Sequence, residues 1–291
     1  MPICPECRTA EVGFHAPECP ACGWRGDGRD GVYEFLADRD RDGGVFAAYT
    51  ELYERIAADD VENPIQGDEL LDLEAERLLD TLGPVTGQAV CDIGIGRGLV
   101  FDRLRAGGPR MLVGVDLAWP YLRRAGADDP AVRLMRANAE NLPFRAELDA
   151  IVASDVLEHV LNPADFLDTA VQALAPGGRL LVKVPYRENI SQYRRSEGCP
   201  YPTVHLRTFD RALLGQALED AGLDVERFTY SGFYAGRWQP PLRRVPQIHH
   251  RLTRLLDRRY GAAPATNRID PRLGRLLMRP VVITALARRP G

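Results

Sequence analysis

Four cysteines near the start of the sequence have the spacing of a metal site. Two residues separate Cys4 from Cys7 and Cys19 from Cys22, and eleven residues lie between the pairs. Two such turns can bring four thiolates to one point, as tetrahedral zinc requires. Four cysteines leave zinc no open position, so we expect a structural zinc site. The alternative, two disulfides, needs an oxidising compartment. Because no secretory signal is visible, we expect a cytoplasmic protein.

Three alternating glycines form a second group with chemical potential. Gly94, Gly96 and Gly98 follow a short apolar run, with Asp92 two residues before the first of them. Glycines at the carboxyl end of a strand let the backbone turn tightly and approach a ligand closely. The spacing is neither the dinucleotide fingerprint G-x-G-x-x-G nor a phosphate loop. A carboxylate at the end of the next apolar run, Asp116, could accept both ribose hydroxyls of a nucleoside.

Short apolar runs alternating with helical patterns predict the elements that must position these residues. The predicted strands are 89–93, 111–115, 132–135, 149–153, 178–184, 223–230 and 281–287. The predicted helices are 45–58, 67–82, 97–106, 119–126, 163–175 and 210–221. Such alternation implies a parallel sheet with helices on both faces. We therefore expect an α/β fold with a Rossmann-like, seven-stranded, mostly parallel sheet, preceded by a small zinc ribbon.

Changes of pattern along the chain divide it into five parts. We expect a zinc ribbon, a helical lead-in or lid, a core domain, a basic insertion and a final core strand; their ranges are 1–36, 37–88, 89–235, 236–279 and 280–291. The composition, with 45% hydrophobic and 27% charged residues, is typical of a folded globular protein. Apolar runs are far shorter than the roughly 20 residues of a membrane helix.

The net charge of −4 conceals two oppositely charged parts. Residues 236–291 hold 13 arginines and two acidic residues, whereas residues 1–235 hold 24 basic and 39 acidic residues. Apolar residues recur near helical spacing over 242–259 with arginines between them. This stretch could contact an anionic membrane surface, bind a phosphorylated substrate, cap the pocket or simply pack on the sheet as a solvated helix.

Three further motifs complete an ordered series. After the third predicted strand comes Asn138-Ala139-Glu140-Asn141-Leu142-Pro143-Phe144. The fourth gives Ser154-Asp155-Val156-Leu157-Glu158-His159-Val160, and Leu174-Ala175-Pro176-Gly177-Gly178-Arg179-Leu180 leads into the fifth. Together with the glycine turn, this order over 89–185 resembles a class I S-adenosylmethionine (SAM)-dependent methyltransferase of the small-molecule type. The resemblance covers about 140 residues, counted with the last two strands.

The resemblance implies a set of cofactor-binding residues. The three glycines would lie under the methionine part of SAM, Asp92 would bind its polar end, and Asp116 would bind the ribose. The remaining candidates would surround the adenine, face the methionine amine or form an aromatic lid; they are Leu117, Asn138, Ala139, Glu140, Ser154 and Tyr49, with Tyr53 beside it. The family most often has Asp where Asn138 stands, which weakens the expected contact with the adenine amino group. For the two tyrosines, simple helix packing is the alternative.

The acceptor side is less well defined. His159 and His205 are the candidate bases, because imidazole titrates near neutral pH, and Tyr186 borders the expected pocket. Each histidine also has a structural alternative. His159 could simply belong to a helix start, and His205 could hold the N-terminal end of the helix that follows it. Arg207 could hold an anionic group. Asp155 and Glu158 would orient neighbouring groups rather than act as bases.

Three functions remain open at this stage. The first is methyl transfer to a small molecule, by O-methylation of a secondary metabolite in natural product biosynthesis or of an anionic or lipid-linked intermediate. The second is methylation of an rRNA base, because some rRNA methyltransferases also carry an N-terminal zinc ribbon. The third is SAM binding without methylation, as in a cyclase. The pattern indicates no oligomeric state.

Overall fold

The computed structural model describes residues 1–41, 44–64, 68–126, 129–193, 196, 201, 204–231, 251 and 281–291. Apart from Arg251, the predicted amphipathic stretch 242–259 lies outside the described residues. The predicted contact of that stretch with an anionic surface therefore stays a prediction. No helix among the described residues combines the length and the apolar character that crossing a membrane requires.

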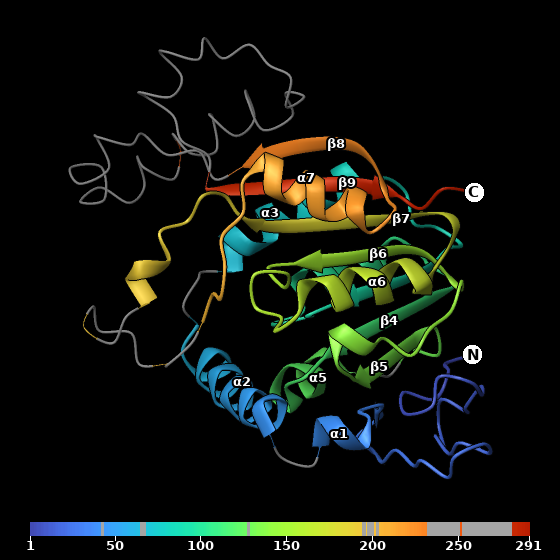
Figure 1. Ribbon diagram of the computed structural model, residues 1–291. Helices are drawn as coiled ribbons and strands as arrows, with labels where there is room; N and C mark the ends of the chain where they lie inside the picture. The colour runs from blue at the N-terminus through green and yellow to red at the C-terminus, as the bar shows by residue number, and fades with distance from the viewer. Residues whose placement is uncertain are drawn as a thin grey trace.

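One sheet of nine strands runs through the described part of the chain. Figure 1 shows its larger part, with β8 at one edge and β9, β7 and β6 following in order. Its strands are β1 (Gly28–Arg29), β2 (Val32–Glu34), β3 (Ala89–Ile93), β4 (Met111–Asp116), β5 (Val132–Arg136), β6 (Leu148–Ser154), β7 (Leu174–Pro185), β8 (Asp224–Ser231) and β9 (Val282–Arg288). Their order across the sheet is β1-β2-β5-β4-β3-β6-β7-β9-β8. The five central strands are parallel, and β9 pairs antiparallel with both β7 and β8. The seven predicted strands are thus confirmed as a mostly parallel sheet.

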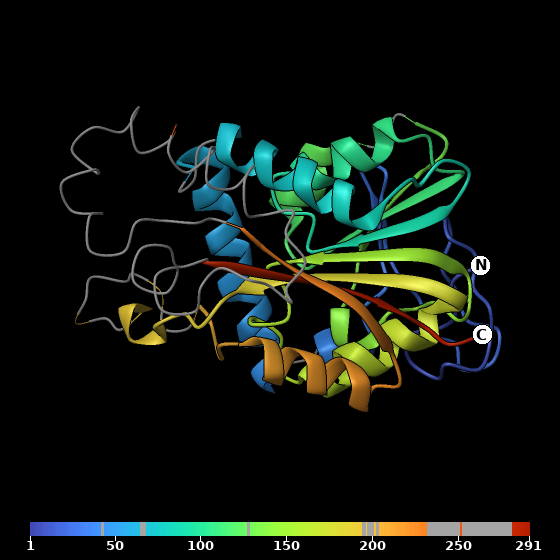
Figure 2. The same ribbon diagram turned by 90° about the horizontal axis from the view of Figure 1, so that it is seen from above.

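Helices cover both faces of this sheet (Figure 2). They are α1 (Asp38–Arg41), α2 (Gly44–Glu62), α3 (Asp68–Leu82), α4 (Leu99–Ala106), α5 (Trp119–Ala125), α6 (Pro163–Ala173) and α7 (Arg211–Asp220). Side chains that alternate along the strands separate two apolar cores. One core contains buried residues of α6 and α7, and the other contains buried residues of α3, α4 and α5.

The two additional strands come from the cysteine-rich segment. β2 pairs in parallel with β5, and β1 pairs antiparallel with β2. The sequence pattern assigned Val32 and its neighbours to a separate ribbon. In the structure Val32 and Phe35 are fully buried, and Phe35 N–H donates to Arg136 O at 2.7 Å. The ribbon is therefore continuous with the sheet, because an edge strand offers unpaired backbone groups that a neighbouring segment can satisfy.

Smaller differences lie at element ends. The helical lead-in predicted from residue 37 begins with the short helix α1, ahead of the first predicted helix. β7 begins at Leu174, directly after α6, whereas the pattern placed a helix to residue 175 and a strand from 178. Asn162 caps α6, since its side-chain oxygen accepts from Ala164 N–H, and Pro163 is the first helical residue.

Candidate functional site

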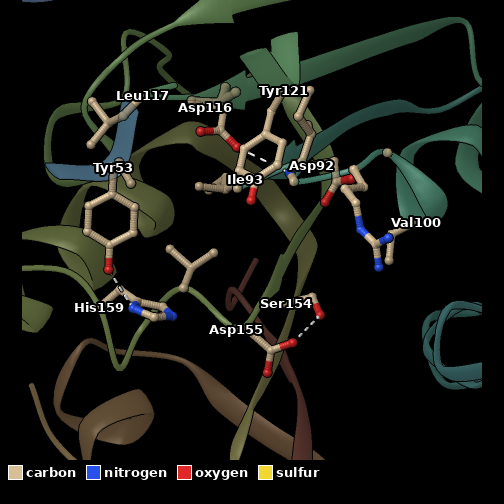
Figure 3. A pocket seen from close by; sticks show the side chains of 18 of the residues that line it. Tyr53, Asp92, Ile93, Val100, Asp116, Leu117, Tyr121, Ser154, Asp155 and His159 are labelled. Carbon is tan, nitrogen blue, oxygen red and sulfur yellow. Dashed lines mark hydrogen bonds between the residues drawn. The ribbon is translucent and has the colours of Figure 1, made fainter. Parts of the chain in front are cut away.

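A cavity of about 400 Å³ opens at the carboxyl ends of the central strands (Figure 3). It lies between the ends of β3, β4 and β6 and helices α2 and α3, which is where open α/β sheets bind ligands. All eleven residues proposed above as cofactor ligands line it: Tyr49, Asp92, Gly94, Gly96, Gly98, Asp116, Leu117, Asn138, Ala139, Glu140 and Ser154. His159 also lines it, and Tyr186 and His205 do not.

The glycine turn forms the floor of this cavity. Gly94, Gly96 and Gly98 all have positive φ, at 70°, 51° and 89°, which favours glycine over any other residue. A Cβ on Gly94 would lie 2.6 Å from Val156 Cγ2. The turn is held to the next strand, because Gly94 N–H donates to Val115 O at 2.7 Å. The backbone therefore stays close to any ligand in the cavity.

Asp116, at the end of β4, closes one side of the cavity. Its carboxylate accepts from Gly96 N–H at 3.2 Å and from Ala118 N–H at 2.9 Å. Burial raises the pKa of Asp116 to about 6, an effect that these backbone donors oppose and that Glu54 reinforces. The carboxyl group is thus fixed in orientation and lies at the cavity surface, where it can accept hydroxyl groups of a ligand.

Asp92 presents a buried polar atom without a partner in the described part of the chain. It is 1% exposed, and its Oδ2 has no hydrogen-bond partner among the described residues. Burial and then the charge of Asp116 raise the pKa of Asp92 well above its usual range. A buried carboxyl oxygen without a partner is costly. Since Asp92 lines the cavity, a hydrogen-bond donor on the ligand would remove that cost.

The adenine side predicted from the sequence has an additional partner. Asn138 Oδ1 accepts from Glu140 N–H at 2.9 Å, and Asn138 Nδ2 donates to Asp40 Oδ2 at 3.3 Å. Asp40 is buried on α1, and burial raises its pKa. No role was predicted for Asp40 from the sequence, which placed it only in the helical lead-in. The carbonyl of Asn138 therefore already has one donor, although a second lone pair remains for a ligand.

Helix α2 reaches the cavity through two tyrosines. Tyr49 Oη donates to His159 O at 3.0 Å, and Tyr53 Oη lies 2.6 Å from His159 Nδ1 (Figure 3). The two tyrosine rings are 4.5 Å apart. Burial raises the pKa of both phenols. These contacts tie α2 to the loop after β6, so the tyrosines line the cavity rather than only packing within the helix.

The only lysine of the chain lies beside the cavity. Lys183 Nζ contacts Glu74 Oε2 and Asp155 Oδ2, each at 2.6 Å, and its side chain is buried at the end of β7. Burial lowers the pKa of Lys183, but the two carboxylates raise it more, so the ammonium stays charged. No role was predicted for this lysine from the sequence. Its position at the end of a predicted strand was the available signal.

The two candidate histidines, His159 and His205, lie side by side next to the cavity. The rings of His159 and His205 are 4.5 Å apart at 80°, and both Nε2 atoms lie 4.0 Å from Glu158 Oε1. His205 Nδ1 contacts Glu188 Oε2. Burial, and then the neighbouring His205, lower the pKa of His159 to about 4. Glu188, for which no role was predicted from the sequence, lies two residues after Tyr186 in the loop that follows β7.

The surroundings of Tyr186 and Arg207 differ from the acceptor-side positions expected from the sequence. The Tyr186 ring packs edge-on against Tyr230, at 5.2 Å. Arg207 donates to the carbonyls of Leu157, Val160 and Leu161. Its guanidinium thus braces the loop that carries His159, so the structure gives it a positioning role rather than a free anion site.

The four N-terminal cysteines converge as their spacing predicted. Cys4 Sγ lies 3.7 Å from Cys22 Sγ, and Cys7 Sγ lies 3.6 Å from Cys19 Sγ. All four sulfurs lie within 4.8 Å of one another, and none forms a disulfide. A tetrahedron with Zn–S distances of about 2.3 Å has edges of about 3.8 Å. The cluster therefore fits a tetrahedral metal ion.

The cysteine cluster is joined to the cavity by a short chain of contacts. Asn141 Nδ2 donates to Pro5 O at 2.9 Å, and Arg8 Nη1 donates to Asn141 Oδ1 at 2.7 Å. Ile3 N–H donates to Pro143 O at 2.8 Å. These bonds hold the segment that follows β5, whose first residues, 138–140, line the cavity. The ribbon thus supports one wall of the site.

Comparison with known proteins gives concordant matches. A family model described as a methyltransferase domain matches residues 53–227. A Mycolicibacterium smegmatis protein named as an S-adenosylmethionine-dependent methyltransferase is 33% identical over 141 residues, which are 48% of this chain and 53% of that protein. A tRNA U34 carboxymethyltransferase of Colwellia psychrerythraea is 32% identical over 117 residues, 38% of this chain and 36% of that protein. The chain thus spans about half or less of these relatives.

Among solved structures, a complex between the Haloferax volcanii Trm112 methyltransferase activator and a methyltransferase contains a similar fold. The match has a TM-score of 0.57 and 19% identity, and it covers 82% of this chain and 98% of the matched chain. At that identity the likeness concerns the fold.

Proposed function

The chain belongs to the methyltransferase domain family, and from this premise we propose that it transfers a methyl group from SAM to a hydroxyl group of a small molecule. The observation that carries the proposal is the cavity lined by all eleven predicted cofactor residues, with His159 on its wall. When bound, SAM supplies a methyl group on a sulfonium centre, so the protein has to align the acceptor and assist loss of its proton.

The residues that would hold SAM fit its chemistry. Asp92 offers its unpartnered oxygen to the positively charged amine, the glycine turn leaves room for the methionine backbone, and Asp116 accepts the ribose hydroxyls. The backbone of Ser154 faces the same end, with Leu117 and Ala139 beside the adenine. We propose zinc for the four-cysteine cluster on the basis of its sulfur distances.

The acceptor side supports a small molecule. Tyr49 and Tyr53 join the cavity wall to the loop of His159, and the cavity of about 400 Å³ has room for SAM and a small acceptor. Residues 1–235, which include the cavity and the ribbon, hold 24 basic and 39 acidic residues. Such a surface disfavours a nucleic acid backbone. We assign His159 and His205 to activation of the acceptor hydroxyl.

RNA is the second candidate acceptor, and two observations favour it. The curated relatives include tRNA U34 carboxymethyltransferases, and residues 236–291 contain 13 arginines against two acids. An arginine-rich segment of this kind could bind phosphates.

A labelled-methyl assay separates the two candidates. The purified chain is incubated with methyl-labelled SAM and either a panel of phenols, catechols and hydroxylated acids or total RNA. The small-molecule proposal expects S-adenosylhomocysteine and labelled product with the panel at a rate insensitive to salt. Label appearing only in RNA, with salt-sensitive binding, would replace it with the second candidate.

The affinity for SAM is expected to fall as the pH is lowered through about 6. Asp116, with its pKa of about 6, faces Asp92, Glu54 and Tyr121. A ribose prefers the ionised carboxylate, so only the deprotonated fraction binds. At pH 5 that fraction is about one tenth, which predicts about tenfold weaker binding than at pH 7. Calorimetric titration across pH 5–8 measures this. The variant Asp116→Asn should lose the step near pH 6, and a wild-type profile without that step would contradict the assignment.

A further inference from the structure

We propose that Glu158, His159 and His205 form a divalent metal site beside the methyl-transfer cavity, distinct from the cysteine cluster. One ligand atom of each residue lies within 4.8 Å of the other two. The Nε2 atoms of both histidines are 4.0 Å from Glu158 Oε1, too far for a hydrogen bond. Metal–ligand distances of about 2.0–2.2 Å place two ligands of one ion about 3 to 4 Å apart. The gap between these side chains therefore matches an ion more closely than a direct contact.

The carboxylate of Glu158 is the observation that points to a ligand. Glu158 is 1% exposed, and neither of its oxygens has a hydrogen-bond partner on another described residue. A buried carboxylate without partners is expensive to maintain. Lys183, the nearest ammonium group on the cavity wall, is already held by Glu74 and Asp155. A cation between Glu158 and the two histidines would supply the missing partner.

Hydrogen bonds on the far side of each imidazole orient its Nε2 lone pair toward Glu158. His159 Nδ1 lies 2.9 Å from Val204 O, which can only accept, and 2.6 Å from Tyr53 Oη, which can accept as well as donate. We assign the hydrogen of the neutral ring to Nδ1, the tautomer that satisfies the carbonyl. The carboxylate of Glu188 likewise accepts the hydrogen of His205 Nδ1. In each neutral ring the atom left to coordinate is Nε2. Metal-binding histidines usually have this arrangement, with the second nitrogen donating to a carbonyl or carboxylate.

The backbone around the cluster is held in place independently of any ion. Leu206 N–H donates to Glu158 O at 2.9 Å, so the segment that contains His205 is bonded directly to the loop of Glu158. Arg207 donates to three carbonyls of the same loop. The Tyr193 ring packs at a tilt of 58° against the His205 ring, with the centroids 4.7 Å apart. Two segments that are 46 residues apart in sequence therefore present their three ligands from one rigid frame.

Two imidazoles and one carboxylate suit a divalent first-row transition ion such as Mn²⁺, Fe²⁺, Co²⁺ or Zn²⁺. Three protein ligands leave further positions for water or an acceptor oxygen, unlike the four-thiolate cluster. Because His159 is part of the cavity wall, the ion would lie next to the acceptor. Coordination lowers the pKa of a hydroxyl group, whose proton then passes to solvent water. This catalytic role rests on the proposed function, whereas metal binding does not.

The test is titration of the full chain, with zinc retained in the ribbon, by Mn²⁺ alone. Mn²⁺ prefers oxygen and nitrogen ligands and leaves a thiolate site to zinc. Electron paramagnetic resonance of free Mn²⁺ should show one bound ion per chain. Glu158→Gln and His205→Gln should weaken binding by more than about 100-fold, and Glu188→Gln, which removes only the outer partner, by about 10- to 100-fold. His15→Gln, an exposed histidine in the ribbon, is the matched control and should bind as the wild type does.

The outcomes separate this inference from the proposed function. Wild-type protein that binds no Mn²⁺, or binds it as weakly as folded Glu158→Gln, overturns the metal site whatever the activity. Thermal melting identifies any variant that fails to fold, and the wild-type titration decides the question without the variants. If Mn²⁺ binds at this site but no hydroxylated acceptor is methylated, the metal site stands and the proposed acceptor falls.

Discussion

Replacing Asp116 with alanine is expected to weaken SAM binding by more than about 100-fold. A hydrogen bond to a charged group contributes about 1.5–3 kcal/mol, so loss of two ribose contacts removes about 3 kcal/mol or more, and each 1.4 kcal/mol is tenfold in affinity. The substitution also removes the acceptor of Gly96 N–H and Ala118 N–H, which hold the glycine turn. Titration calorimetry with SAM or S-adenosylhomocysteine measures the loss.

Two companion variants make this measurement specific. Asp116→Asn keeps the shape of the side chain but not its charge, so an intermediate loss is expected. Asp102→Ala removes an exposed carboxylate from α4 that pairs with Arg105, and its affinity should equal that of the wild type. Unchanged affinity in Asp116→Ala would remove the cofactor site as described.

Loss of the ribbon metal should destabilise the whole molecule. Cys22 is exposed, and an ordinary exposed substitution changes stability by less than about 0.5 kcal/mol. Because structural zinc contributes about 10–16 kcal/mol in small zinc domains, Cys22→Ser is expected to lower the melting temperature by about 10 °C or more. The zinc content, measured by mass spectrometry, should fall by one ion per chain.

The same variant should also weaken SAM binding, since Pro5 and Arg8 hold Asn141 next to the cavity wall. Ala21→Ser places a hydroxyl at an exposed position between the last two cysteines and serves as the control, with zinc content and melting temperature unchanged. Wild-type protein prepared without chelators and found free of zinc would contradict the metal assignment.

Local patterns determined which features could be predicted. The glycine turn, the caps and the apolar runs act over a few residues, so strands such as β3 appeared at the predicted positions. The cofactor candidates shared one strand edge, and the cavity brings them together. Their roles stay predictions.

Contacts between segments distant in sequence could not be predicted from local patterns. Asp40 meets Asn138, and Glu158 meets His205, across separations that no periodicity encodes. Considered singly, each of these residues has an ordinary structural role, in the helical lead-in or at the start or end of a helix. Only the folded chain shows that Glu158 lacks a partner and that His159 and His205 face it.

The pairing of β2 with β5 also bears on how the protein behaves in concentrated solution. Without β2, the five-residue strand β5 would end the sheet with a row of unpaired N–H and C=O groups, a template for pairing with another chain. In the structure β5 is covered, and the sheet ends instead in β1, which has two residues. Short edge strands of this kind resist aggregation. The cysteine cluster holds β2 in place, and β2 covers the edge of β5. A chain without its ribbon metal would therefore lose solubility as well as stability.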